Sequence, residues 1–253
     1  MIKELKIFFT TLQYYTRIPC PRWVGHSPEQ FSESRRYFPI IGWIVGGAAA
    51  GVFYLAQFIF PVSISILLSM VAGVLLTGAF HEDGFADTCD GFGGGWAKEE
   101  VLMIMRDSRI GTYGTIGLIL ILFLKFLLLF NINSAAIPIV LWAAHSVSRF
   151  AVMIFQYTDT YARDSSDSKA KPMAQKITFR DLCIAACFGL LPMLFLNQGY
   201  GLLLLIPVLV TTYFFARYCN RRIGGYTGDC LGAAQQLCEL TFYLGFVALW
   251  KFI

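Results

Sequence analysis

Long stretches of this chain contain almost no charged residue, and shorter segments rich in charge separate them. No Asp, Glu, Lys or Arg occurs in residues 38–80 or 182–216, and residues 110–148 contain a single one, Lys125. A helix of about 20 apolar residues crosses the hydrocarbon core of a bilayer. The pattern therefore predicts seven membrane-spanning helices, over residues 38–60, 62–80, 113–130, 134–155, 182–197, 199–216 and 231–252.

The amino-terminal segment has a different pattern, in which apolar residues form one stripe and Lys3 and Lys6 lie off it. The stripe consists of Ile2, Leu5, Phe8, Phe9 and Leu12. Such a pattern predicts an amphipathic helix over residues 1–20 that lies at the membrane interface. We therefore expect an all-α fold, a polytopic integral membrane helix bundle with about seven transmembrane helices plus this interfacial helix. Residues 1–253 form one membrane-embedded domain in this interpretation, because the polar segments are short.

Composition supports the same class. Hydrophobic residues make up 57% of the chain and charged residues 14%, whereas soluble domains have about 25% charged residues. A large soluble protein with an unusually apolar core is the alternative. The seven cysteines show neither C-x-x-C nor a paired Cys/His zinc spacing. The net charge of +4 gives no reason to expect nucleic-acid binding.

The basic residues predict how the chain is oriented. All Lys and Arg residues except Lys125, Arg149 and Lys251 lie in four segments, residues 1–37, 81–112, 156–181 and 217–230. Since cytoplasmic loops carry the excess of Lys and Arg, these segments should face the cytoplasm of a bacterial inner membrane. A charge inside a span is costly unless it is paired. Glu239 is the expected partner of Arg149, and Lys125 has no obvious partner.

The densest acidic group follows the second expected span and reads His81-Glu-Asp-Gly-Phe-Ala-Asp-Thr-Cys-Asp-Gly91. On a helix, Asp83, Asp87 and Asp90 fall within about 60° of one another. No Lys or Arg occurs in residues 37–97 to neutralise them. Oxygen ligands of this kind suit Mg²⁺, Mn²⁺ or Ca²⁺, and a solvated acidic loop is the alternative. Gly84 and Ala86 place almost no side chain between the aspartates, which should let a phosphate approach the metal closely.

The next segment adds candidate groups. A helix over residues 97–109 should end in Met105-Arg-Asp-Ser-Arg-Ile-Gly111. Asp107 is a candidate fourth carboxylate, and Arg106 and Arg109 can clamp phosphate oxygens. Anchoring at the cytoplasmic face would also explain either Arg. His81 is a candidate general base, although a lone histidine is more often structural.

A second polar group precedes the last expected span. Residues 220–229 contain three glycines within five positions, followed by Asp229. Glycines expose backbone N–H groups, and a helix that starts at Asp229 would favour anions at its N-terminus. The alternative is that Asp229 is an ordinary N-cap.

Together these segments resemble the cobalamin synthase family, also named adenosylcobinamide-GDP ribazoletransferase. The resemblance rests on the two groups above and on Thr16-Arg-Ile-Pro19, Phe38-Pro-Ile-Ile-Gly42, Ile104-Met-Arg-Asp-Ser-Arg-Ile-Gly111 and Gly224-Gly-Tyr-Thr-Gly-Asp-Cys-Leu-Gly-Ala-Ala-Gln-Gln236. It extends from about residue 10 to about residue 245. Glu82 stands where this family often has Leu, so it should not be an essential ligand.

The resemblance implies a transferase of cobalamin biosynthesis. With Mg²⁺, the 5′-hydroxyl of α-ribazole, or its 5′-phosphate form, would attack adenosylcobinamide-GDP and release GMP. The catalytic metal ligands would be Asp83, Asp87, Asp90 and Asp107, with His81 as a further catalytic residue. The residues that contact substrate would be Arg17, Arg106, Ser108, Arg109, Thr227 and Asp229. Partners would be these substrates and the lipid bilayer, with no nucleic acid, and a homo-oligomer is compatible with the sequence.

Two other functions fit part of the pattern. CDP-alcohol phosphotransferases also use aspartates spaced by four at a membrane face, but their Asp-Gly-x-x-Ala-Arg core has Arg after Ala. Here Asp87 follows Ala86. A transporter would place its ion sites within broken helices, whereas the acidic residues here cluster in the loops.

Overall fold

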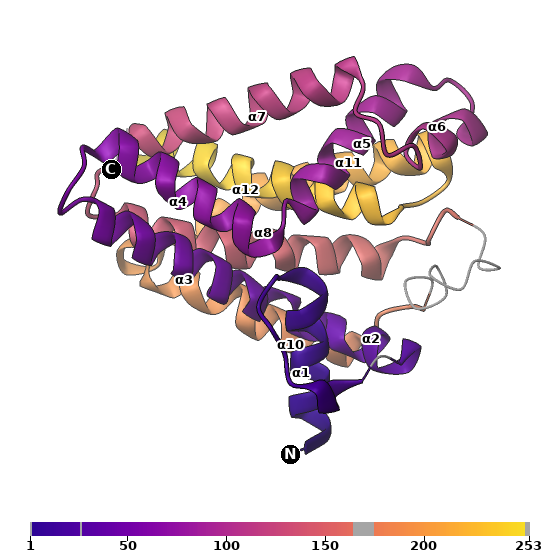
Figure 1. Ribbon diagram of the computed structural model, residues 1–253, viewed down its shortest axis with the longest axis horizontal. Helices are drawn as coiled ribbons and strands as arrows, with labels where there is room; N and C mark the ends of the chain where they lie inside the picture. The colour runs from indigo at the N-terminus through magenta and orange to yellow at the C-terminus, as the bar shows by residue number, and fades with distance from the viewer. Residues whose placement is uncertain (1, 26, 164–174, 251–253) are drawn as a thin grey trace.

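The computed structural model describes residues 2–25, 27–163 and 175–250, and within them every regular element is helical (Figure 1). One isolated β-bridge joins Tyr161 to Tyr226. The expected all-α fold is therefore confirmed. The α-helices are α1 Ile2–Tyr15, α2 Pro28–Ser34, α3 Phe38–Ala56, α4 Val62–Thr77, α5 Phe80–Gly94, α6 Lys98–Ile104, α7 Thr112–Phe130, α8 Ile137–Thr158, α10 Phe179–Leu190, α11 Leu205–Ile223 and α12 Gly228–Trp250.

The expected spans all coincide with helical segments, but fewer than seven of these segments have the length and apolar character of a span. Four segments of the described chain are long and apolar enough to cross a membrane, Gln30–Ala56, Thr112–Phe130, Ile137–Thr158 and Gly201–Ile223. The bent pair α4 and α5 would make a fifth. By contrast, α10 has 12 residues, and α12 carries several polar side chains. The structure supports a multi-pass membrane protein, and a count of seven spans stays a prediction.

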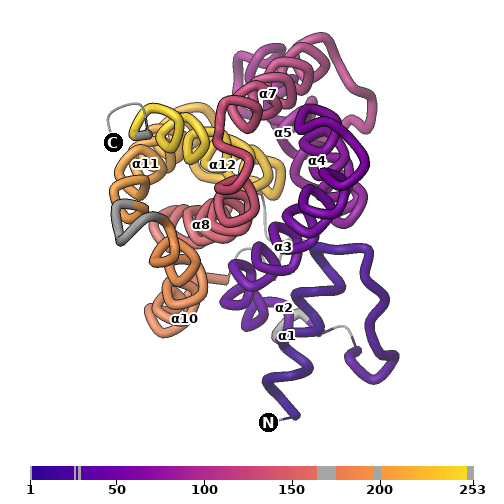
Figure 2. Tube along the Cα trace, turned by 90° about the vertical axis from the view of Figure 1, so that its left-hand side faces the viewer, coloured from indigo at the N-terminus to yellow at the C-terminus, as the bar shows by residue number. Residues whose placement is uncertain are grey.

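Helix α8 lies at the centre of the bundle, with α3 and α12 on either side (Figure 2). Its span is 72% buried, against 28% for α7. Gly42 and Gly46 of α3, four residues apart, allow the closest approach. A Cβ at Gly46 would lie 2.9 Å from the carbonyl oxygen of Leu141, and a Cβ at Gly42 would overlap the backbone of His145. Small residues at this spacing let helices pack closely in lipid, where apolar burial gives no drive for association.

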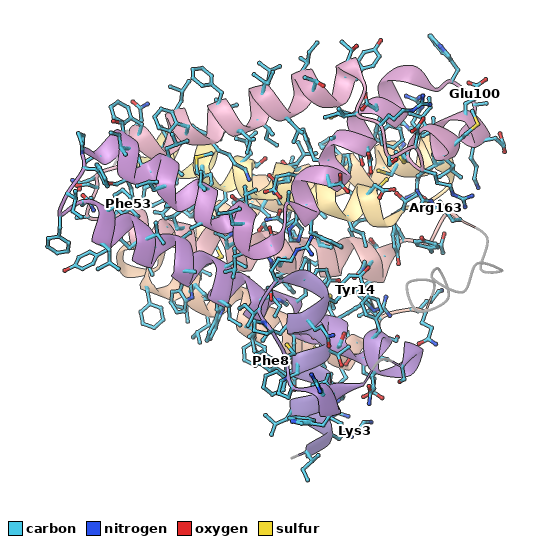
Figure 3. All side chains as sticks on the ribbon, viewed as in Figure 1. Lys3, Phe8, Tyr14, Phe53, Glu100 and Arg163 are labelled. Carbon is cyan, nitrogen blue, oxygen red and sulfur yellow. The ribbon has the colours of Figure 1, made fainter. Side chains whose placement is uncertain are left out.

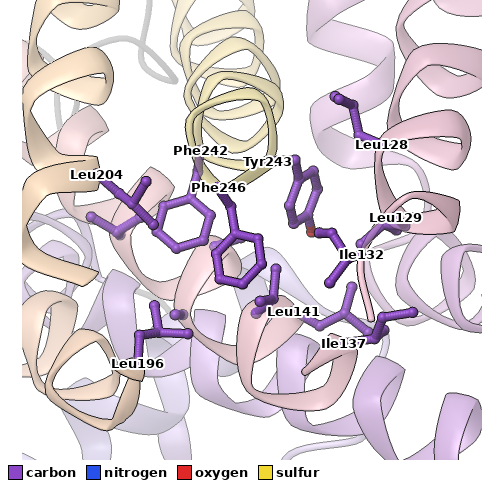
Figure 4. Packing of buried hydrophobic residues seen from close by; sticks show 14 of the residues in the cluster. Leu128, Leu129, Ile132, Ile137, Leu141, Leu196, Leu204, Phe242, Tyr243 and Phe246 are labelled. Carbon is purple, nitrogen blue, oxygen red and sulfur yellow. The ribbon is translucent and has the colours of Figure 1, made fainter. Parts of the chain in front are cut away.

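The largest apolar cluster fills one end of this bundle (Figure 4). Phe242 and Phe246 of α12 are packed there with Ile137 and Leu141 of α8, and each is at most 2% exposed. The helices α5 and α6 lie at the opposite end (Figure 1), which we call the α5 end. The apolar cluster therefore anchors α8 and α12 at a distance from the polar residues considered below.

The chain turns sharply between α4 and α5, whose axes form an angle of 87°. Gly78 at φ 65° and Ala79 at φ 58° make this corner, and Gly is the residue that adopts positive φ at little cost. The side chain of Arg17 lies against Gly78, and its backbone N–H donates to the carbonyl of Leu76 at 2.8 Å. The bend lies near the end of the second expected span, residues 62–80, and the position of α5 outside the membrane stays a prediction.

The amino-terminal helix forms as expected, although α1 ends at Tyr15 rather than near residue 20. The prolines at positions 19 and 21 explain the early end, because Pro cannot continue a helix. Ile2 and Leu5 of the predicted stripe are 69% and 45% exposed, whereas Leu12 is 6% exposed. The first turns therefore offer apolar side chains to a membrane surface, while the last turn packs on the protein.

The charges inside the spans are paired differently from the expectation. Lys125, expected to lack a partner, places Nζ 2.9 Å from Oε1 of Glu239. The guanidinium of Arg149, the expected partner of Glu239, donates instead to the carbonyl of His145 at 2.8 Å. The imidazole Nδ1 of His145 lies 3.4 Å from Oε2 of Glu239. Glu239 therefore pairs with α7, and α8 reaches it through His145.

Candidate active site

The acidic residues of α5 lie on a helix, as predicted, but they are not equivalent. Asp83 is exposed, Asp87 is half-buried and Asp90 is 8% exposed. The helix runs through Gly91 and Gly93 and ends at Gly94. A Cβ at Gly91 would overlap Met105, and one at Gly93 would overlap the ring of Tyr113. These two glycines allow close packing.

Asp90 is an anchor between two helices. Its Oδ2 accepts from the backbone N–H of Gly111 at 2.7 Å, and its Oδ1 accepts from that of Gly114 at 2.8 Å. Both donors belong to the start of α7, where N–H groups have no partner within the helix and a negative charge is stabilising. The structure therefore gives Asp90 a capping role for α7. Its role as a metal ligand stays a prediction.

Asp83 and Asp87 have free carboxylates, since neither side chain has a hydrogen-bond or ion-pair partner in the described ranges. Partial burial raises the pKa of Asp87, and nearby negative charges, above all Asp229 and Asp83, raise it further, to about 7. Carboxylates crowded in this way are stabilised by a cation. Within the described residues, no group of three or more His, Cys, Asp and Glu side chains is arranged to hold a metal ion, and the metal site stays a prediction.

Asp229 of α12 belongs to the same acidic group because α12 packs tightly against α5. A Cβ on Gly84 would lie 3.0 Å from the carbonyl oxygen of Asp229, and one on Gly232 would lie 3.3 Å from Cα of Gly84. Gly84 therefore makes room for a helix, and the expectation that it makes room for a phosphate is wrong. The N-cap of α12 is Thr227, whose Oγ1 accepts from the N–H of Cys230 at 3.2 Å. Thr227 is fully buried, and its role as a substrate contact stays a prediction.

A basic residue that the sequence did not single out reaches this group from a distant segment. Arg163 places Nη2 2.8 Å from Oδ2 of Asp229. The backbone brings it there, because Ala162 N–H donates to the carbonyl of Tyr226 at 2.9 Å and Tyr226 N–H donates to that of Thr160 at 3.0 Å. Figure 3 shows Arg163 at the same end of the bundle as Glu100, with Phe53 at the opposite end. Asp229 is therefore paired with a cation from a distant segment, whereas Asp83, Asp87 and Asp90 have no Lys or Arg partner in the described part of the chain.

The segment after α6 is a loop rather than the predicted helix, since α6 ends at Ile104. Asp107 accepts from the backbone N–H of Arg109 at 3.1 Å, a local bond that competes with helix formation. The side chains pair as well, with Nη2 of Arg109 2.6 Å from Oδ2 of Asp107. These hydrogen bonds lower the pKa of Asp107 to about 2. Arg106 and Ser108 are exposed beside them, so the loop presents both Arg side chains to solvent.

His81 lies apart from this exposed loop. Its ring is 2% exposed and is stacked with Tyr15 and Phe38, at centroid distances of 6.4 and 5.8 Å. Its Nε2 has no hydrogen-bond partner among the residues that the structure describes. Glu82 faces the same interior, and its Oε1 accepts from Nε2 of Gln236 at 3.0 Å. A general-base role for His81 stays a prediction, and its enclosure by aromatic rings gives that role no support.

The fold and this site together define a multi-pass helical membrane protein whose carboxylates gather with Arg side chains at one end of the bundle. The chain matches the model of the family described as cobalamin-5-phosphate synthase over residues 7–247. The chain belongs to this family.

Curated relatives agree over almost the whole length. Adenosylcobinamide-GDP ribazoletransferase of Shewanella frigidimarina is 44% identical over 250 residues, which cover 98% of this chain and 96% of the relative. The protein of the same name from Shewanella oneidensis is 45% identical over 245 residues, covering 95% and 93%. That from Leptospira interrogans is 44% identical over 260 residues, covering 99% and 98%. No solved structure matches the chain.

Proposed function

We propose that this chain transfers the cobinamide-bearing phosphoryl group of adenosylcobinamide-GDP to α-ribazole or α-ribazole 5′-phosphate, with release of GMP. The product is adenosylcobalamin or its 5′-phosphate. The names of the curated relatives support the substrates. The observation that carries the chemistry is the crowding of Asp83, Asp87 and Asp229 at the α5 end, with Arg163 paired to Asp229. Phosphoryl transfer depends mainly on positioning and on neutralising charge, and this site offers both.

Mg²⁺ fits the free carboxylates of Asp83 and Asp87, because hard oxygen ligands suit it and because the crowded charges need a cation. When bound there, Mg²⁺ would neutralise the pyrophosphate oxygens. Asp90 and Asp107 are engaged by backbone N–H groups and by Arg109 in the structure. We therefore assign Asp83 and Asp87 as the principal ligands.

The transfer forms one P–O bond and breaks another. A ribose hydroxyl of the acceptor attacks the phosphorus on the cobinamide side, the bond from that phosphorus to the GMP oxygen breaks, and the hydroxyl loses its proton. An acceptor that already carries a 5′-phosphate has no 5′-hydroxyl. One site that accepts both forms must therefore use another hydroxyl, and the expectation of a 5′-hydroxyl attack is wrong. The exposed Arg106 would bind the guanosine-side phosphate through bidentate hydrogen bonds. Arg109 would do so after exchanging its partner Asp107 for the phosphate.

We further propose that the α5 end faces the cytoplasm of the inner membrane. The excess of Lys and Arg in the segments at that end supports this orientation. A homo-oligomer remains compatible with the sequence and plays no part in the mechanism.

The test is an assay of purified protein in lipid with Mg²⁺ and adenosylcobinamide-GDP. GMP and a corrinoid product should appear when α-ribazole or its 5′-phosphate is added, and EDTA should stop the reaction reversibly. Asp83→Asn should abolish turnover and leave the melting temperature unchanged or higher, while Thr241→Val, a change far along α12, should leave turnover intact. Release of CMP from a CDP-alcohol, without any corrinoid product, would overturn the proposal in favour of a phospholipid-type phosphotransferase.

A further inference from the structure

A network of buried polar side chains crosses the middle of the bundle. The ammonium of Lys125 on α7 lies 2.9 Å from Oε1 of Glu239 and donates to Oε1 of Gln236 at 2.7 Å, both on α12. Nε2 of Gln235 donates to Oε2 of Glu239 at 2.7 Å and to Oγ of Ser148 on α8 at 3.1 Å. Each of these residues is at most 5% exposed. The network therefore joins α7, α8 and α12 by directional bonds inside the apolar bundle.

The network borders a cavity of about 40 Å³, between α3, α4, α5, α7, α8 and α12. Three polar atoms that lack a hydrogen-bond partner among the described residues belong to side chains that line it, Nε of Arg149, Nε2 of His81 and Oε2 of Glu82. At roughly 10–15 Å³ per water, a cavity of this volume has room for about three water molecules beside these polar atoms.

Stability alone does not account for a buried ion pair of this kind. Replacing such a pair with well-packed apolar residues is often neutral or stabilising, because taking both charges out of water is costly. What a satisfied network adds is a single arrangement of the helices that carry it. In lipid, apolar helix faces pack without a hydrophobic drive that would fix their register.

The helix whose register matters most is α12. Its first turn carries Asp229, and Gly232 one turn later meets Gly84 of α5 at backbone distance. A displacement of α12 by one turn would move Asp229 by about 5.4 Å away from Asp87. The polar network binds α12 at Gln236 and Glu239, which lie only a few residues beyond the contact between Gly232 and Gly84.

We propose that Lys125, Gln236 and Glu239 are positioning residues for the transfer reaction, since they fix α12 so that Asp229 meets the α5 carboxylates. This inference rests on the proposed function. The residues touch neither substrate nor metal in this proposal. They act through the placement of α12 against α5.

The test compares Lys125→Met, Glu239→Leu and the double variant, with adenosylcobinamide-GDP and α-ribazole as substrates. Each single variant leaves a buried group without its charged partner, so its melting temperature should fall. The double variant should recover most of that loss, yet its kcat should stay about tenfold to a hundredfold below wild type, with KM for both substrates unchanged. A purely structural role predicts instead that kcat recovers together with the melting temperature.

Thr241→Val is the matched control, because it removes a contact of 3.1 Å between α12 and Thr211 of α11 that lies outside the network. It should leave kcat unchanged. If the double variant does not fold, Gln236→Met decides the question, since it alters no charge, and a wild-type kcat for that variant overturns the proposal. Wild-type kcat in a stable double variant also overturns it. A wild-type protein without any transfer activity would refute the proposed function itself. Wild-type kcat in the variants would refute only the positioning role.

Discussion

Replacing Asp90 should destabilise the protein, whereas replacing Asp87, about one helical turn away, should not. Asp90→Ala leaves the buried N–H of Gly114 and the partly buried N–H of Gly111 without their carboxylate acceptor. A hydrogen bond to a charged group contributes about 1.5–3 kcal/mol, so the loss of both should cost about 3–6 kcal/mol. Asp90→Asn keeps one acceptor oxygen and should cost about 1–2 kcal/mol.

Thermal unfolding in detergent with EDTA measures this difference without any contribution from bound metal. For a chain of this length, about 3 °C corresponds to 1 kcal/mol, so the Asp90→Ala protein should melt at least about 10 °C lower. Asp87→Asn relieves repulsion between carboxylates and should melt at the wild-type temperature or above. An Asp90→Asn protein as stable as wild type would show that this carboxylate does not hold the start of α7.

The remaining predictions concern charge, activity and topology. In EDTA, the free energy of unfolding should fall as the pH rises from about 4 through about 7, because Asp87 has a pKa raised from 3.8 to about 7 and must ionise among like charges. Asp87→Asn should remove that part of the pH dependence and abolish GMP release. Glu82→Leu should keep wild-type turnover, and a loss would show that Glu82 contributes to the reaction. Arg163→Met should lower kcat/KM by at least about tenfold, because Asp229 loses its paired cation, and unchanged kinetics would exclude that role. Single cysteines at Trp96 and Asn133, in a background without the seven native cysteines, should react with impermeant reagents from opposite sides of the membrane.

Much of the helical architecture follows from the sequence, because a long apolar run has few alternatives to a helix in lipid. The pattern places α3, α4, α7 and α8 within a few residues of their observed bounds. It is less informative for α6, where an Asp side chain binds the backbone N–H of Arg109 and ends the helix early. Local side-chain bonds of this kind depend on rotamers, and the hydrophobic pattern does not record them.

The site was predicted in its residue types more than in its contacts. The pair Arg163 and Asp229 is separated by 66 residues in sequence, and Lys125 and Glu239 by 114, so no local spacing could indicate either pair. The role of Asp90 depends on the start of α7 folding back over α5. The sequence contained one indication of Arg163, its place in the charged segment of residues 156–181 that was expected at the same membrane face as the acidic residues.

The contact between α5 and α12 also bears on how relatives of this chain can be recognised. Two residues without a side chain, Gly84 and Gly232, meet there, and a Cβ at Gly232 would lie 3.2 Å from the carbonyl oxygen of His81. A larger residue at either position would push the two helices apart and separate their aspartates. A divergent protein that keeps the acidic residues but has a bulky residue at the position of Gly84 would have a different helix crossing. Its aspartates would then be expected to serve another reaction.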